Sequence, residues 1–129
     1  KKMTDQDVFA LCRCYFEMGR VGEAAQLLRG ISAKLTDAGA LQFAATLFQE
    51  AHQDADAEDA LNRYLKLNPS GDANAWADLA KLQFRAGRKQ AAQQSFIQGY
   101  QIDRQTLFQR LQKDQELYNL AAPLFQRRQ

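Results

Sequence analysis

The chain has 129 residues, of which 46% are hydrophobic and 25% charged, with 17 lysines and arginines against 15 aspartates and glutamates. This composition is typical of a folded globular protein and excludes a disordered or fibrous one. Two cysteines cannot build a disulfide framework, one histidine cannot anchor a zinc site alone, and no apolar run reaches the about 18 residues of a membrane span.

Charge is distributed unevenly along the chain. Residues 1–35 hold six basic and four acidic side chains, residues 36–72 hold two and seven, and residues 79–129 hold nine and three. We interpret these charges as the solvated faces of surface helices. A nucleic-acid surface needs basic residues clustered with aromatic ones and few acids nearby, so the acidic middle argues against nucleic acid as a partner.

The apolar residues have helical spacing from the start of the chain. The first predicted helix has one apolar stripe, formed by Val8, Leu11, Cys12 and Tyr15. Thr4 and Asp7 resemble a capping box at the start of this helix, and Gly19 suits its end.

The same two-helix pattern recurs twice. Five further stripes follow in chain order: Ala24, Ala25, Leu28 and Ile31; Leu41, Ala44, Ala45 and Phe48; Ala57, Leu61, Tyr64 and Leu65; Trp76, Leu79 and Ala80; Ala92, Phe96 and Tyr100. Alignment of Val8, Leu41 and Trp76 gives steps of 33 and 35 residues. The clearest turn is Asn-Pro-Ser-Gly at 68–71.

A period of about 34 residues built from paired helices resembles the tetratricopeptide repeat (TPR) family. The third unit matches the family motif best, through Trp76, Leu79, Ala80, Ala92 and Phe96. The resemblance implies an all-α fold, a right-handed superhelix of antiparallel helix pairs. We expect a single domain with repeats at about 5–36, 37–70 and 72–104.

The match to the family has three departures. Gln83 stands in place of an aromatic residue, His52 in place of the turn glycine, and Arg104 in place of the final proline. Small residues at Cys12, Ala45 and Ala80 would let paired helices approach to about 8–10 Å.

Residues 105–129 depart from the repeat pattern, and we expect them to cover the last repeat as a capping segment. Two short helices are predicted, with the stripes Leu107, Phe108 and Leu111, and Leu117, Tyr118 and Leu120. Asp114 would cap the second helix, and Pro123 should interrupt or kink its continuation to Phe125. Arg127 and Arg128 are expected to end the chain in disorder.

No catalytic or metal site can be assembled from the sequence, and we expect no enzyme activity and no cofactor. Cys12 and Cys14 point roughly 200° apart on a helix, so they cannot share a metal or a disulfide. His52 has no second histidine or cysteine nearby. The acidic run at 54–59 suits the positive end of a helix dipole.

The resemblance implies that the first helix of each pair lines a concave groove. The candidate partner-binding residues are those one step off the core stripes: Phe9, Arg13, Phe16, Phe43, Thr46, Glu50, Lys81, Phe84 and Arg85. Exposed aromatic residues in a groove are typical of binding anchors. The alternative is that these phenylalanines pack against each other or under the capping segment.

The predicted function is a non-catalytic scaffold or adaptor that docks a peptide or a helix of another protein. The alternative is self-association, or packing within a larger and possibly membrane-anchored protein. The start Lys1-Lys2-Met3 favours a piece of a longer chain, and no membrane insertion is expected of this segment. The two cysteines fit a cytoplasmic setting without excluding another, and a homo-oligomer stays possible.

Overall fold

The computed structural model describes residues 3–70 and 72–126. Within these residues the protein has eight α-helices, one short 3-10 helix and no strand, which confirms the all-α prediction. Two compact units divide inside helix α4 (Asp54–Leu67), between Tyr64 and Leu65. The single domain and the superhelix stay predictions.

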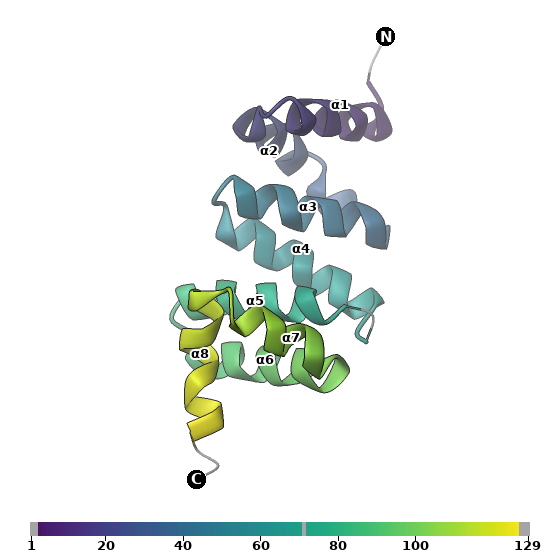
Figure 1. Ribbon diagram of the computed structural model, residues 1–129. Helices are drawn as coiled ribbons and strands as arrows, with labels where there is room; N and C mark the ends of the chain where they lie inside the picture. Colours follow the sequence, from purple (N-terminus) through teal and green to yellow (C-terminus); the bar gives the residue numbers. More distant parts are fainter. Residues whose placement is uncertain (1–2, 71, 127–129) are drawn as a thin grey trace. The chain divides into compact units, whose positions relative to one another are not determined.

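The first unit contains two helix pairs joined by a short linker (Figure 1). In chain order its elements are α1 (Asp5–Glu17), α2 (Val21–Arg29), the 3-10 helix η1 (Ser32–Lys34), α3 (Ala38–Glu50) and most of α4. The predicted capping box at the start of α1 is confirmed. The Asp7 amide donates to Thr4 Oγ1 at 3.1 Å, and the Thr4 amide donates to Asp7 Oδ2 at 3.0 Å.

The stripes predicted for α2, α3 and α4 are buried throughout. Leu28, Leu41 and Phe48 are among the largest fully buried side chains. The small residues Cys12 and Ala45 are buried as well, as expected where helices approach closely. The period of the apolar residues therefore located these helices and their inner faces.

The three helix pairs share one turn geometry. In each turn the helix ends with a residue near φ −80° to −85°, and the next residue takes a left-handed φ: 82° at Gly19, 61° at His52 and 86° at Gly87. In the first turn the Gly19 amide donates to Phe16 and the Arg20 amide to Tyr15, and the other two turns repeat both bonds. This is a Schellman motif, which satisfies the last carbonyls of a helix.

One guanidinium group binds the linker between α2 and α3, residues 30–37. Arg63 of α4 donates to the carbonyls of Ser32 at 2.9 Å, Ala33 at 3.3 Å and Leu35 at 2.6 Å. The same side chain pairs with Asp59 one helical turn earlier at 3.2 Å. Arg63 thus adds side-chain hydrogen bonds to three backbone carbonyls of the linker.

The second unit contains one helix pair and two shorter helices (Figure 1). Its helices are α5 (Ala73–Arg85), α6 (Lys89–Ile102), α7 (Arg104–Leu111) and α8 (Gln115–Gln126), after the end of α4. One core joins all four helices. Its buried residues are Ala73, Ala77, Ala80, Ala92, Phe96, Leu107, Leu117, Leu120 and Ala121.

Helices α5 and α6 approach each other closely at Gly99 of α6. A Cβ atom at this position would lie 2.9 Å from the Cβ of Trp76 and 3.0 Å from the carbonyl oxygen of Ala73. Because one of these atoms is backbone, no side chain larger than hydrogen fits without moving a helix. Trp76 is also fixed to the segment before α5, since its Nε1 donates to the Pro69 carbonyl at 2.9 Å.

The two short helices predicted after the third pair are present, but the predicted stripes are wrong at Phe108 and Tyr118, which are exposed. Asp114 Oδ1 accepts from the Leu117 amide at 3.1 Å, so it caps α8 as expected. Helix α8 continues through Pro123 to Gln126, so the expected interruption is wrong, and the alternative of a kink stays a prediction. The lost hydrogen bond would leave the Asn119 carbonyl unpaired, but both residues are exposed and water can reach it. The expectations for Gly71, Arg127 and Arg128 lie outside the described residues.

Candidate functional site

Three half-buried phenylalanines form an aromatic cluster between α1 and α3. The rings of Phe9 and Phe43 meet edge to face with centroids 5.4 Å apart, and Phe16 meets Phe43 in the same way at 5.5 Å. Edge-to-face contact of this kind is the favoured geometry of aromatic pairs. These residues contact one another, as the alternative reading of the sequence stated, and each keeps part of its surface accessible to solvent.

Arg13 lies over this aromatic cluster as a cation. Its guanidinium carbon is 5.6 Å from the centroid of the Phe43 ring, within the range of a cation–π interaction. The side chain is exposed and forms no ion pair with any residue the structure describes. Its charge and its hydrogen-bond donors are therefore available to a ligand that contacts the aromatic cluster.

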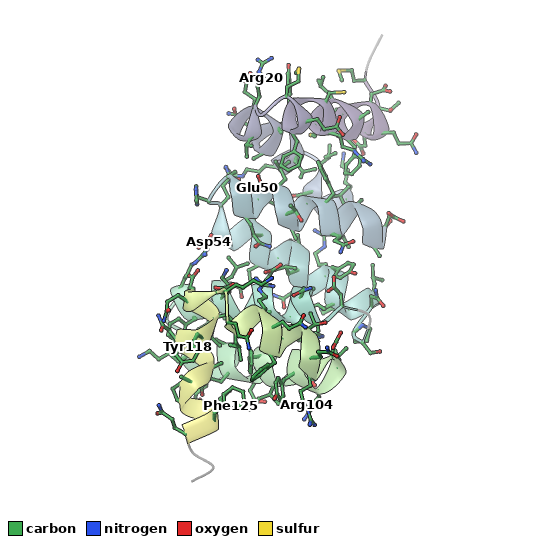
Figure 2. The ribbon with its side chains drawn as sticks, in the orientation of Figure 1. Arg20, Glu50, Asp54, Arg104, Tyr118 and Phe125 are labelled. Atoms are coloured by element: carbon green, nitrogen blue, oxygen red, sulfur yellow. The ribbon has the colours of Figure 1, made fainter. Side chains whose placement is uncertain are left out.

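Thr46 and Glu50 lie further along α3, and both are exposed. The Thr46 hydroxyl donates to the carbonyl of Gln42 at 3.2 Å, an ordinary bond of a helical threonine to the preceding turn. Glu50 is the last residue of α3 and is labelled in Figure 2. Six of the nine predicted binding residues thus belong to α1 and α3 in the first unit.

The other three predicted residues belong to α5, and two of them, Lys81 and Arg85, pair with the capping segment. Lys81 Nζ lies 2.9 Å from Asp114 Oδ2, and Arg85 forms a hydrogen-bonded ion pair with Glu116 of α8. Phe84 is partly buried against the core of the second unit. In the folded chain Lys81 and Arg85 pair with residues at the start of α8, and the role of all three residues in partner binding stays a prediction.

Arg110 completes this charge network and was not singled out from the sequence. Its guanidinium lies 2.5 Å from Asp78 Oδ1 and 3.3 Å from Asp114 Oδ2. Burial would lower the pKa of Arg110, but the charge of Asp78 and its hydrogen bond outweigh burial and raise that pKa. Arg110 therefore stays charged and links α7 to α5.

The Asp114 carboxylate accepts hydrogen bonds from three different groups. Burial would raise the pKa of its carboxyl group, but the bonds from Lys81, the Leu117 amide and Arg110 hold that pKa below its usual value. The hydrogen bond from Arg85 lowers the pKa of Glu116 in the same way, against partial burial. Both carboxylates are thus charged near neutral pH and committed to contacts inside the second unit.

The cysteines occupy different environments. Cys12 is buried in the core of the first unit, and burial raises the pKa of its thiol, whereas Cys14 is exposed; both are free. Across residues 3–70 and 72–126, no group of three or more histidine, cysteine, aspartate or glutamate side chains could hold a metal ion. None of the helices described is both long and apolar enough to cross a membrane.

The chain matches no protein-family model, and no curated protein matches it either.

Proposed function

We propose that the chain is a TPR-like module that docks a peptide or a helix of another protein and performs no catalysis. The docking surface is formed by α1 and α3, with Phe9, Phe16 and Phe43 as apolar anchors and Arg13 as the charged contact. The observation behind this proposal is the partly accessible aromatic cluster with an exposed arginine over it that forms no ion pair with a described residue. Aromatic and arginine side chains are the residues enriched at binding hot spots.

The repeat assignment is supported by local geometry. The left-handed turn residues Gly19, His52 and Gly87 have the same 33- and 35-residue spacing as the apolar stripes. In a TPR array, successive first helices would extend the surface of α1 and α3 into a groove. The proposal therefore includes the right-handed superhelix of helix pairs.

The function can be tested by selection of peptides on the intact chain. A displayed library of random 12-residue peptides should yield binders in which an aromatic or aliphatic residue lies near a carboxylate. Replacing Phe43 by Ala or Arg13 by Glu should weaken these binders by about tenfold or more, a loss typical of an interface hot spot. Met18→Ala is the matched control, because Met18 is an exposed apolar residue just after α1.

Two results would contradict the proposal. The first is a library that yields no binder, or only binders that both Phe43→Ala and Arg13→Glu leave unchanged. The second is a stable dimer in sedimentation analysis that Phe43→Ala dissociates, because self-association would then occupy this surface.

A further inference from the structure

The outer face of the capping segment is apolar. Within the described part of the chain, six large hydrophobic side chains are exposed, and three of them belong to α7 and α8: Phe108 at 53%, Tyr118 at 50% and Phe125 at 40%. A terminal cap of a repeat array keeps its outer face polar, since solubility requires it. Covering the core of the second unit therefore does not explain the exposed surface of these three residues.

The three aromatic residues line one open groove between α7 and α8. The groove has a volume of about 360 Å³, and small residues at Ala121 and Ala122 leave room between its aromatic sides. Figure 2 labels Tyr118 and Phe125 on α8 and Arg104 at the start of α7.

A second groove, of about 490 Å³, is also lined by Phe125. Tyr100 and Arg104 line this second groove, and the Phe125 ring meets the Tyr100 ring edge to face at 5.7 Å. Phe125 lines both grooves, so the two hollows adjoin at this residue. We call the surface formed by these two grooves the α8 face.

The charge of the α8 face is positive. Among the described residues that line the two grooves, Arg104 is the only charged one, and it forms no ion pair with a described residue. Its guanidinium carbon lies 5.7 Å from the centroid of the Tyr100 ring. Lys113, at the end of the α7–α8 turn, is exposed and also unpaired among these residues.

The nearby acidic residues are occupied elsewhere. Asp103 accepts hydrogen bonds from the amide and hydroxyl of Thr106, which hold the pKa of its carboxyl group below the usual value. Asp114 and Glu116 pair with Lys81 and Arg85 of α5. No described acidic residue lines either groove, so a carboxylate on a ligand would find Arg104 without an internal competitor.

We infer that the α8 face docks an acidic amphipathic helix of another protein. Its apolar side chains, at i, i+3 or i+4, and i+7, would enter the two grooves beside Phe125, and a flanking carboxylate would pair with Arg104. The 12 residues of α8 are about 18 Å long, enough to pack along three turns of a helix. A groove formed by two helices presents no strand edge with which an extended peptide could pair.

Charge argues against a second copy of this chain as the occupant. In a twofold symmetric dimer through this face, each copy would bring the positive charge of Arg104 into the interface, and no described acidic residue of either groove would be there to pair with it. Repulsion between like charges disfavours that arrangement. A free small molecule fits less well, because such ligands prefer enclosed pockets and both grooves are open.

The test uses the intact chain and two synthetic helical peptides of about 16 residues, each about 24 Å long. Both peptides have leucines at i, i+4, i+7 and i+11, and their flanking positions are all glutamate in one peptide and all lysine in the other. In fluorescence anisotropy the glutamate peptide should bind at least about tenfold more tightly than the lysine peptide. Phe108→Ser and Tyr118→Ser should each weaken the glutamate peptide by about tenfold.

Charge reversal provides a variant that leaves the core intact. Arg104→Glu should remove the preference for the glutamate peptide or invert it. Two matched controls should leave its binding unchanged: Met18→Ser at an exposed apolar residue of the first unit, and Lys89→Glu at an exposed lysine of α6. Phe43→Ala separates this inference from the proposed function: a glutamate peptide that Phe43→Ala releases and Phe108→Ser does not would be bound at the aromatic cluster of α1 and α3, which would overturn this inference and leave the proposed function standing.

Several outcomes would overturn the inference. They are equal affinity for the two peptides, no binding of either, and binding that survives both Phe108→Ser and Tyr118→Ser. A dimer of the parent chain that Phe108→Ser dissociates would assign the face to a second copy. Binding to phosphatidylserine vesicles that the same variants abolish would assign it to a lipid surface. Circular dichroism melts confirm that each variant is folded before its binding is compared.

Discussion

The hydroxyl of Ser95 donates a 2.6 Å hydrogen bond to Oε1 of Gln83, and both side chains are buried between α5 and α6. The corresponding positions of the two earlier pairs, Tyr15 and Phe48, are aromatic. A polar amide in a core position is costly unless it is hydrogen-bonded. Ser95 therefore makes the glutamine tolerable at this position of the third pair.

Ser95→Ala should lower the free energy of unfolding by about 1–3 kcal/mol, because it leaves the Gln83 oxygen buried without its donor. The double variant Gln83→Met with Ser95→Ala should recover most of this loss, since replacing both partners by apolar groups is close to neutral. Urea unfolding of the parent, both single variants and the double variant measures the coupling. Purely additive losses would contradict the role given to this bond.

The left-handed turns provide a second prediction. His52→Gly should raise the free energy of unfolding by about 0.5–1 kcal/mol, because glycine takes a positive φ without the steric cost that histidine meets. Gly87→Ala, with open space around its Cβ, should lower it by about 1 kcal/mol for the same backbone reason. Thermal melts of both variants test this. If His52→Gly lowers the free energy of unfolding as much as Gly87→Ala does, the positive φ is not what determines stability at these turns, and the prediction is wrong.

Acid should weaken the attachment of α8. Because the pKa of Asp114 is lowered in the folded chain, its charge contributes stability that is complete above the ordinary carboxyl pKa of about 4. That contribution is lost as the pH falls through the lowered pKa. Asp114→Asn should therefore cost about 1.5–3 kcal/mol at pH 7 and progressively less below about pH 4.

Denaturant unfolding of the parent and Asp114→Asn at several pH values measures this trend. Glu17→Gln is the control, because Glu17 is an exposed carboxylate of α1 that forms no ion pair with a described residue. A difference between the parent and Asp114→Asn that stays constant from neutral to acid pH would contradict the assigned network.

The aromatic cluster and the core should respond differently to truncation. Phe48 and Phe96 are almost fully buried, so replacing either by alanine should cost about 3–5 kcal/mol. Phe9 and Phe43 are only half-buried, and their truncation should cost about 1–2 kcal/mol. Guanidinium unfolding of the four variants makes the comparison. Equal losses at all four positions would show that the aromatic cluster is part of the core.

Residues close in sequence allowed most of the helices to be predicted. Helical spacing located the buried stripes, and Thr4 and Asp114 each signalled the start of a helix through a bond to an amide three residues on. The expected interruption at Pro123 was also predicted from residues close in sequence, and the helix does not stop there. The steric conflict at Pro123 was anticipated, but the exposure that makes the conflict tolerable depends on tertiary structure.

The candidate site was harder to predict because it depends on contacts between distant residues. Lys81 and Arg85 were placed in a groove from their helical position alone. Their partners Asp114 and Glu116 lie 33 and 31 residues later in the chain. Phe108 was assigned to an apolar stripe, yet more than half of it is exposed. The sequence shows which residues form an apolar stripe. It does not show how much of that stripe a neighbouring helix covers.

Arg63 bears on how the first unit unfolds. Its hydrogen bonds to the linker carbonyls join a residue of the second helix pair to the segment that leaves the first. Where helix pairs are stacked, the bonds between two pairs determine whether the terminal pair unfolds by itself or together with the next pair. Fraying of α1 and α2 that displaces the linker would break all three bonds at once. We therefore expect the amides of α2 and α4 to exchange with solvent in one shared opening event.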